Sequence, residues 1–180
     1  MLEMKGVFYL ANDVFLVKKA QKGDQEAFIQ LVKEYEPVLY NMARRFLKNE
    51  QDIADVLQET VITAYQKLNQ LKNPKYFNTW ICRIMINQCK KLMSLEPSFD
   101  IEDYPFLVDN QETEHLAMND LLAGLKPIYR IPLVLYYYNG FSVKEISEIL
   151  TEPTGTIKSR LARGRVLLQK EYIGSEGGLV

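Results

Sequence analysis

The segment from Phe141 to Lys170 constrains the fold most strongly, because it has the pattern of a capped helix, a tight turn and a second, basic helix. Ser142 and Glu145 have the spacing of a capping box, which gives the first helix a defined start. Pro153 cannot continue that helix, but it suits the first turn of the next one, where its missing N–H is not needed. The charged residues from Thr156 to Lys170 are all basic and are Lys158, Arg160, Arg163, Arg165 and Lys170.

This pattern is typical of a helix-turn-helix, in which the second helix reaches base edges in a major groove and cations contact phosphates. Ile157, Leu161 and Leu168 are expected on the inward face of that helix. A C-terminal helical hairpin with a solvated basic face is the alternative interpretation. The order of a capped helix, a proline-led turn, small residues and clustered cations favours DNA binding.

The composition of the whole chain excludes several classes of protein. No apolar run approaches the roughly 20 residues that span a membrane, and the N-terminus lacks a secretory pattern, so we expect a cytoplasmic protein. The only histidine is His115, so the sequence supplies too few histidines for a histidine-based metal site and offers one candidate for a catalytic triad. No cofactor is expected. Cys82 and Cys89 are seven residues apart on a predicted helix, about 10 Å along its axis, and are expected to be buried thiols. The net charge of −1 means that nucleic-acid binding must come from local patches.

Helical periodicity runs through the N-terminal half of the chain. Asn12 or Asp13 can cap a first short helix, Gly23 suits its C-cap, and Asp24 can cap the next. Further helices are expected over residues 25–47, 52–71 and 79–92. Pro37 is expected to kink or interrupt the first of these near Tyr35.

The predicted helix over residues 52–71 has an apolar side and an acidic side. The stripe expected to be buried consists of Ile53, Val56, Leu57, Thr60, Val61, Ala64, Tyr65 and Leu68. The polar residues off this stripe include Asp52, Asp55, Gln58 and Glu59. Catalytic carboxylates are not indicated, because no base, metal ligand or nucleophile accompanies them, and a solvated face is the alternative.

Residues 72–78 mix lysines with aromatics, a composition that stacks unpaired bases and neutralises phosphates. The candidates in this loop are Lys72, Asn73, Lys75, Tyr76 and Phe77. The alternative is a turn whose Phe77 fills the core. The following helix presents Arg83, Asn87, Lys90 and Lys91, a set with no acid, which suits either nucleic acid or ordinary solvent exposure.

The composition changes at residues 94–113, which carry acids and prolines but neither lysine nor arginine. This stretch is expected to be an acidic linker between two small all-α domains, and its apolar residues predict contacts with another surface. The expected divisions are a leader at 1–11, a first domain at 12–93, the linker at 94–113, a second domain at 114–173 and a frayed tail at 174–180.

Two helical units joined by an acidic linker resemble a bacterial sigma factor of the extracytoplasmic function type, within the sigma-70 family. Four segments match in order between Lys18 and Tyr172. Residues 20–28 (AQKGDQEAF) resemble the start of region two, and residues 52–60 (DIADVLQET) resemble the most recognisable run of the family. Residues 77–84 (FNTWICRI), followed by Asn87, resemble the promoter-melting segment. Residues 155–165 (GTIKSRLARGR) resemble the recognition helix of region four.

The resemblance implies three binding surfaces on two regions, a region-two helical bundle and a region-four helix-turn-helix. The surface for core RNA polymerase, at its β′ clamp helices, would be Asp52, Asp55, Gln58 and Glu59, and the β flap is a further expected contact. The −10 promoter element would be bound by Lys72, Asn73, Lys75, Tyr76, Phe77, Arg83, Asn87, Lys90 and Lys91. The −35 element would be bound by Thr154, Thr156, Lys158, Ser159, Arg160, Arg163 and Arg165.

The resemblance also implies a function without catalysis or a small-molecule substrate. The linker would run through the polymerase towards its active-site and RNA-exit channels. The chain would initiate transcription of a stress or envelope regulon under the control of an anti-sigma factor, a class of protein that is often membrane-bound.

Two positions depart from the family pattern. Glu152 precedes Pro153, where a small capping residue is common, and Thr151 is expected to take over that role. Gly164 stands in place of the usual alanine, which costs about 1 kcal/mol of helix propensity and is expected to let the helix bend or fray.

Two other classes of protein compete with this interpretation. A stand-alone helix-turn-helix regulator would bind DNA by itself, as a dimer on a palindrome. An enzyme would need a nucleotide loop, a metal cluster or a triad, and the sequence offers none. The run at 52–59 and the aromatic–basic loop favour the sigma factor, because a regulator needs neither.

Overall fold

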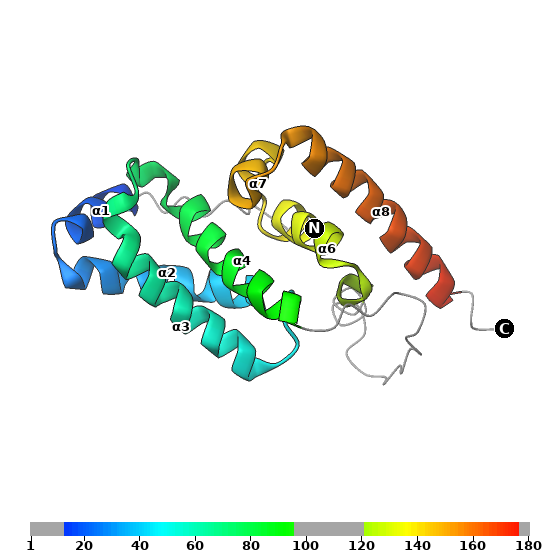
Figure 1. The fold of residues 1–180 in the computed structure, drawn as a ribbon, viewed down its shortest axis with the longest axis horizontal. Coiled ribbons are helices and arrows are strands. Elements are labelled where there is room, and N and C mark those ends of the chain that lie inside the picture. The colour runs from blue at the N-terminus through cyan, green and yellow to red at the C-terminus, as the bar shows by residue number, and fades with distance from the viewer. Residues whose placement is uncertain (1–12, 96–120, 177–180) are drawn as a thin grey trace, which may run out of the picture.

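The computed structural model describes residues 13–95 and 121–176, and within these ranges every regular element is a helix (Figure 1). This confirms the all-α expectation. The leader at 1–11, His115 and nearly all of the expected linker lie outside the described residues. The described part forms two lobes, which we call the N-lobe (residues 13–95) and the C-lobe (residues 121–176).

The N-lobe contains four α-helices and two short 3₁₀ helices. They are α1 (Asp13–Gln21), α2 (Gln25–Ala43), α3 (Glu50–Lys67), η1 (Leu68–Gln70), η2 (Pro74–Tyr76) and α4 (Phe77–Leu95). The caps explain where two of these helices begin. Asp24 Oδ1 accepts the N–H of Ala27 at 3.0 Å, after a turn in which Gly23 has φ +95°. Asn49 Oδ1 accepts the N–H of Gln51 at 2.9 Å, so α3 begins two residues before the expected start.

Two expectations about the N-lobe helices are corrected by the structure. Pro37 was expected to kink or interrupt the helix near Tyr35, and the interruption is absent, because α2 continues through Pro37 from Gln25 to Ala43. The proline is exposed, so the carbonyl that loses its N–H partner can be hydrated. At the other end of the lobe, α4 begins at Phe77 and continues to Leu95, into the first two residues of the predicted linker.

The C-lobe begins with residues 121–124 in helical conformation and continues through α6 (Pro127–Leu133), the π-helix η4 (Val134–Tyr138), α7 (Val143–Leu150) and α8 (Thr154–Glu176). The predicted capping box is present. The N–H of Glu145 donates to Ser142 Oγ at 3.3 Å, and the N–H of Ser142 donates to Glu145 Oε2 at 2.8 Å. The last helix extends to Glu176, so the first three residues of the expected tail are helical.

The core continues from one lobe into the other. Its largest fully buried side chains include Tyr35, Phe77 and Met42 in the N-lobe and Leu133 and Ile146 in the C-lobe. Helix α4 packs on α7, so the first helix of the helix-turn-helix lies beside the last helix of the N-lobe (Figure 1). Cys82 and Cys89 are free, buried thiols on α4, as expected.

Helix α1 carries a buried acid, Asp13, in its first turn. Asp13 is 7% exposed and accepts a hydrogen bond from the Tyr35 hydroxyl. Burial raises the pKa of the Asp13 carboxyl, the Tyr35 hydrogen bond lowers it in opposition, and the nearby Glu34 raises it. This pair joins the start of α1 to the middle of α2.

Candidate nucleic-acid and protein interfaces

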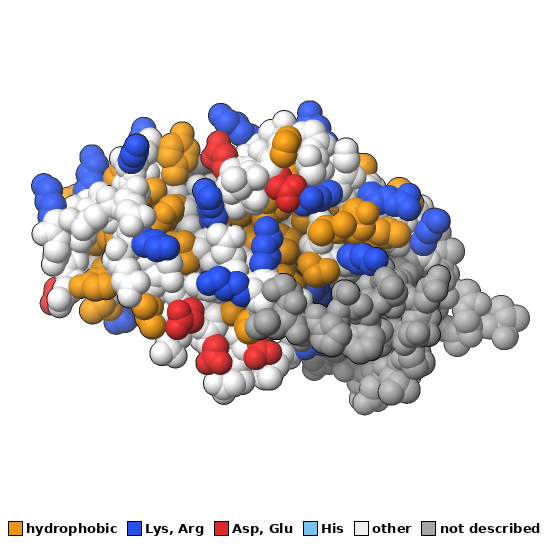
Figure 2. All heavy atoms as spheres, in the orientation of Figure 1, with side chains coloured by type: hydrophobic (Ala, Val, Ile, Leu, Met, Phe, Trp, Pro, Cys, Tyr) orange, Lys and Arg blue, Asp and Glu red, His pale blue; other side chains and the backbone are white. Residues whose placement is uncertain are grey.

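The outer face of α3 carries the residues predicted to bind a protein partner. Asp55, Gln58 and Glu59 are exposed and Asp52 is half-buried, while the opposite face of the helix is in the core. Gln51 Nε2 donates to Asp55 Oδ1 at 3.3 Å, which orders part of this face. Figure 2 shows acidic side chains gathered over this helix, at the lower edge of the molecule. The four candidates therefore share one accessible surface.

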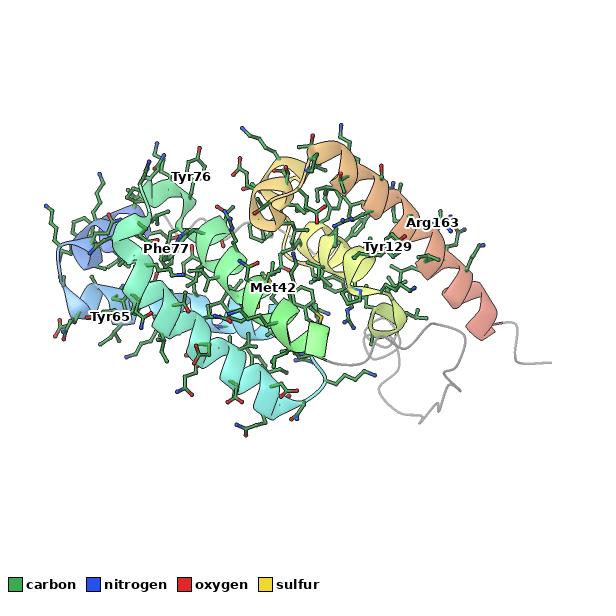
Figure 3. All side chains as sticks on the ribbon, viewed as in Figure 1. Met42, Tyr65, Tyr76, Phe77, Tyr129 and Arg163 are labelled. Atoms are coloured by element: carbon green, nitrogen blue, oxygen red, sulfur yellow. The ribbon has the colours of Figure 1, made fainter. Side chains whose placement is uncertain are left out.

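Two apolar side chains extend this acidic face. Ile62 is 40% exposed, although sequence reasoning did not select it, and it follows Glu59 by three residues, within one helical turn. Tyr65 was expected on the buried stripe, but it is 55% exposed, and its ring makes an edge-to-face contact with Phe28, at 5.1 Å between centroids (Figure 3). A surface that combines exposed apolar groups with carboxylates is typical of a protein-binding face.

The loop before α4 presents most of its predicted residues to solvent. Lys72, Asn73, Lys75 and Tyr76 are exposed, and the Tyr76 side chain keeps 52% of its surface. Asn73 Oδ1 accepts the N–H of Lys75 at 3.1 Å, which caps the 3₁₀ turn η2 and fixes the loop. The loop thus offers one aromatic ring and two ammonium groups on a defined backbone.

Phe77 does not belong to this exposed set. Its side chain is 1% exposed, with the Tyr35 ring at 5.1 Å and the Trp80 ring at 5.8 Å between centroids. The expectation that Phe77 contacts DNA is therefore corrected, because a ring that fills the core is not available to stack on a base. Figure 3 shows Tyr76 outside the loop and Phe77 beneath it.

Helix α4 presents a row of polar side chains at i, i+4 and i+8. Arg83, Asn87 and Lys91 are exposed, and the sequence of α4 contains no acid. Lys91 Nζ donates to Gln88 Oε1 at 3.0 Å. Lys90 differs from the other three candidates, because it is only half-exposed and lies on the flank of the helix that faces the C-lobe.

Helix α8 presents most of the second predicted set. Thr154, Lys158, Ser159, Arg163 and Arg165 are exposed, and Thr156 is half-buried. Figure 3 shows Arg163 on the outer side of the helix, and Figure 2 shows cations along it. The predicted inward face is confirmed for two of its three residues, since Ile157 and Leu161 are buried and Leu168 is half-buried.

Arg160 is turned away from the outer face of α8. Its guanidinium Nη1 donates to Glu152 Oε1 at 2.8 Å, and the two side chains are 25% and 28% exposed. Glu152 lies in the turn between α7 and α8, so this ion pair braces the helix-turn-helix internally. The structure thus separates Arg160 from the other cations of the predicted set.

Thr151 and Gly164, which were discussed with the two departures from the family pattern, have structural roles that differ from those expected. Thr151 does not cap α8 but ends α7, in the left-handed conformation with φ 58° and ψ 46°. Gly164 is buried where α8 crosses α6, and a Cβ there would lie 2.8 Å from Leu133 Cδ1. The glycine permits the close approach of the two helices, a role that no local sequence pattern reveals.

A cavity of about 200 Å³ lies where the two lobes meet. Its lining combines Lys90 of α4 with Glu152 and Arg160 of the helix-turn-helix, and the apolar walls are Pro127, Ile128, Ile131, Pro132 and Leu150. Burial lowers the pKa of Lys90, the Glu152 carboxylate raises it in opposition, and Arg160 lowers it. One cation from each predicted DNA-binding set therefore faces the same carboxylate.

Within residues 13–95 and 121–176, no group of three or more metal-ligating side chains is gathered in one place. In the same ranges, none of the helices is long and apolar enough to cross a membrane.

Two family models match the chain. The model for Sigma-70 region 2 matches residues 31–94, and the model for Sigma-70, region 4 matches residues 115–168. Among curated relatives, the ECF RNA polymerase sigma factor SigW of Bacillus subtilis is 30% identical and covers 86% of this chain and 94% of its own length. The ECF RNA polymerase sigma-E factor of Escherichia coli K12 is 31% identical and covers 86% of this chain and 91% of its own length.

Solved structures support the same relationship. CnrH, in complex with the cytosolic domain of CnrY, has a TM-score of 0.73 and 27% identity, and the match covers 90% of this chain and 97% of CnrH. The sigma factor RpoE of Bartonella quintana, in complex with the anti-sigma factor NepR, has a TM-score of 0.64 and 22% identity over 79% of this chain and 94% of that one. The second similarity shows the fold.

Proposed function

The chain belongs to the ECF RNA polymerase sigma factors of the sigma-70 family, and from this premise we propose how its surfaces divide the work of transcription initiation. It is an alternative sigma factor, which binds core RNA polymerase and promoter DNA. Region 2 corresponds to the N-lobe and region 4 to the C-lobe. We place the boundaries of these regions at 12–93 and 114–173, on either side of the acidic linker.

The face of α3 is proposed to bind the β′ clamp helices of core polymerase. Asp52, Asp55, Gln58 and Glu59 supply its polar groups, and the exposed Ile62 adds an apolar contact at its edge. A mixed apolar and acidic face fits a protein partner better than it fits DNA, because phosphates would repel the carboxylates. The β flap is proposed as a second contact, made by region 4.

The loop before α4 and the outer row of α4 are proposed to bind the −10 element. Tyr76 supplies a ring for stacking on an unpaired base, and Lys72 and Lys75 neutralise phosphates. Asn87 offers an amide that can read a base edge, with Arg83 and Lys91 one turn away on either side. A base of the −10 element must leave the stack before it is read, at a cost of a few kcal/mol.

The outer face of α8 is proposed to bind the −35 element in a major groove. Lys158, Ser159 and Arg163 lie on the exposed side of this helix, close to its N-terminus, where a recognition helix contacts base edges. The observation that carries the whole proposal is the pairing of two exposed faces, on α4 and on α8 as far as Lys170, that both have cations and no acid.

The activity of the chain is controlled by an anti-sigma factor. CnrH and the Bartonella RpoE were both solved in complex with protein partners, CnrY and the anti-sigma factor NepR respectively. We propose a cognate anti-sigma factor of the membrane-bound kind, a stress or envelope regulon, and a cytoplasmic protein without catalysis of its own.

Run-off transcription tests this function. Core RNA polymerase is assayed with and without the protein on the promoter upstream of its own gene, and a specific start is expected only with the protein. Asn87→Ala and Lys158→Ala are expected to reduce that transcript strongly. Lys33→Ala, an exposed lysine on α2 outside the three surfaces, is the matched control and should leave the transcript unchanged.

The possible results test the sigma function and the choice of contact residues independently. No transcript and no co-purification with core polymerase would favour a stand-alone helix-turn-helix regulator. A transcript that survives both substitutions would preserve the sigma function and refute the chosen contacts.

A further inference from the structure

The cavity where the two lobes meet has walls that are mostly apolar. They are formed by Pro127, Ile128, Ile131 and Pro132 of α6 and by Leu150 at the end of α7. Ile128 is 48% exposed, so this wall reaches the surface and the cavity can be entered from solvent. The volume of about 200 Å³ is below the roughly 300–1,000 Å³ of pockets that hold drug-sized molecules. The cavity therefore suits a small molecule with a compact apolar body.

The charged groups that line the cavity leave one cation without an ion-pair partner. Arg160 Nη1 donates to Glu152 Oε1 at 2.8 Å, so these two charges are paired within the C-lobe. Among the described residues, the ammonium group of Lys90 forms neither a hydrogen bond nor an ion pair. Two cations and one carboxylate therefore leave a net positive charge in the lining, and it is located at Lys90.

The half-buried position of Lys90 favours a negative ligand beside it. Burial lowers the pKa of Lys90, and the opposing effect of the Glu152 carboxylate is smaller. An anion bound at the ammonium group would replace part of the lost hydration by a charge-assisted hydrogen bond, which raises this pKa again. An anionic ligand is thus preferred over a neutral molecule of the same shape.

The charges in the lining also select the kind of anion. A phosphate dianion needs more than one free cation, and Arg160 is already paired with Glu152. The Glu152 carboxylate would repel a second negative charge on the ligand, and Lys90 would repel a positive one. A single carboxylate satisfies Lys90 without adding a further charge to an apolar cavity.

We propose that the interlobe cavity binds a small monocarboxylic acid with a compact apolar body, of the aromatic or branched aliphatic kind. Its carboxylate pairs with the Lys90 ammonium group, and its apolar body lies against Ile128 and Ile131 of α6. This site goes beyond the proposed function, which needs no small molecule. Because the lining comes from both lobes, a bound acid favours the arrangement of regions 2 and 4 that keeps the cavity intact.

Methyl NMR on the full chain tests the site, with selective labelling of the isoleucine Cδ1 methyl groups and benzoate as the probe. Benzoate is ionised at neutral pH, and its ring shifts the signals of methyl groups that it touches. The signals of Ile128 and Ile131 are expected to move, whereas that of Ile53, 2% exposed in the N-lobe core, should stay in place. A dissociation constant of about 1 mM is expected for so small a ligand in a partly open cavity.

A matched pair of lysine variants tests the charge. Lys90→Met keeps an unbranched side chain but removes the ammonium group, and it should weaken benzoate binding by about tenfold. Lys91→Met removes a charge from the next residue, which is exposed and does not line the cavity, so the affinity should not change. Benzyl alcohol, which has the same ring without the charge, should bind more weakly than benzoate to the wild type and equally to Lys90→Met.

A second matched pair tests the apolar wall, with the Ile131 signal as the readout. Ile128→Ala should weaken benzoate binding by about threefold, because part of the wall is lost. Val166→Ala, at a similarly exposed position on α8 outside the cavity, should leave the affinity unchanged.

Three results would overturn the proposed site. They are unchanged Ile128 and Ile131 signals at about 10 mM benzoate, equal affinities of the wild type and Lys90→Met, and equal affinities of the wild type for benzoate and benzyl alcohol. If Lys90→Met alters the methyl spectrum before ligand is added, Lys90→Gln decides, and an unchanged affinity there refutes the site. The titration contains neither polymerase nor promoter, so its result is independent of the run-off transcription assay.

Discussion

Phe77 lies edge-to-face on Tyr35, with ring centroids 5.1 Å apart and ring planes at 80°. Both rings are almost completely buried, and they join the first residue of α4 to the middle of α2. Phe77→Ala is expected to destabilise the protein by about 3–5 kcal/mol, the range for removing a buried phenylalanine. Tyr76→Ala, at the exposed neighbouring residue, should change the free energy of unfolding by less than about 0.5 kcal/mol. Urea denaturation measures both, and equal effects would refute the assignment of Phe77 to the core.

Gly155 and Gly164, which both lie on α8, should respond differently to alanine. Gly155 has no heavy atom within 4 Å of a built Cβ, so Gly155→Ala should stabilise the helix by up to about 1 kcal/mol. At Gly164 the Cβ would lie 2.8 Å from Leu133 Cδ1 and 3.2 Å from its Cγ, in a core that leaves Leu133 only 1% exposed. We expect Gly164→Ala to bring no net gain. A thermal unfolding series measures the difference, and an equal gain at both sites would contradict the close approach.

Replacement of Thr151 by asparagine should stabilise the folded protein. A β-branched residue in the left-handed region, here at φ 58°, is strained by roughly 1–2 kcal/mol, whereas asparagine tolerates this region. Because Thr151 is exposed, its replacement disturbs no core packing. Thr151→Asn is therefore expected to raise the free energy of unfolding by about 0.5–1 kcal/mol. An unchanged denaturation midpoint would show that the threonine is not strained.

Asp13→Asn should alter the dependence of stability on pH. The pKa of Asp13 is raised above 3.8 in the folded state, so the folded chain holds this proton more tightly than the unfolded chain does. The free energy that the protonated Asp13 adds to the stability of the fold is fully present below the pKa of Asp13 in the unfolded chain. It is lost as the pH rises through the pKa of Asp13 in the folded chain. Asparagine keeps an acceptor for Tyr35 without the buried charge. The stability of Asp13→Asn relative to the wild type should therefore increase between about pH 4 and pH 7.

Urea denaturation of the two proteins at each pH gives this comparison, in which the other carboxylates cancel. A constant difference across the range would contradict the raised pKa of Asp13.

Lys158 and Arg160 should differ in the salt dependence of promoter binding. Lys158 is exposed on the outer face of α8, and Lys158→Ala should lower the slope of log K against log salt by about 1. Arg160 is paired with Glu152, so Arg160→Ala should lower that slope less. Titrations of the polymerase–sigma complex on one promoter fragment, at several salt concentrations, measure both slopes. The reverse order would place Arg160 on the DNA.

Local patterns in the sequence predicted the local structure well. The Ser142–Glu145 capping box, the Asp24 cap and the positive φ of Gly23 each depend on a few consecutive residues, and all three are present. The order of the helices and the resemblance to one family also depend on contiguous segments, and both are confirmed.

Contacts between different elements explain the errors of sequence reasoning. Periodicity placed Tyr65 on the buried stripe, but its ring is 55% exposed and lies edge-on to Phe28 of α2. The composition of the loop suggested that Phe77 is exposed, and only the position of Tyr35 reveals otherwise. Arg160 belongs by sequence to the basic helix, yet Glu152, eight residues earlier, turns it inward. In each case the deciding partner belongs to another element.

The rate at which the two buried thiols of α4 are modified measures how often the N-lobe opens. Cys82 and Cys89 have relative exposures of 0%, and burial raises the pKa of each to about 12, so a reagent that needs a thiolate cannot modify them in the closed fold. Modification then proceeds only through transient exposure of α4. The modification rate therefore measures how often α4, which carries the proposed −10 contacts, becomes exposed. Cys82 and Cys89 are seven residues apart, so unequal rates would show that the helix frays from one end, and equal rates would show that it detaches as a unit.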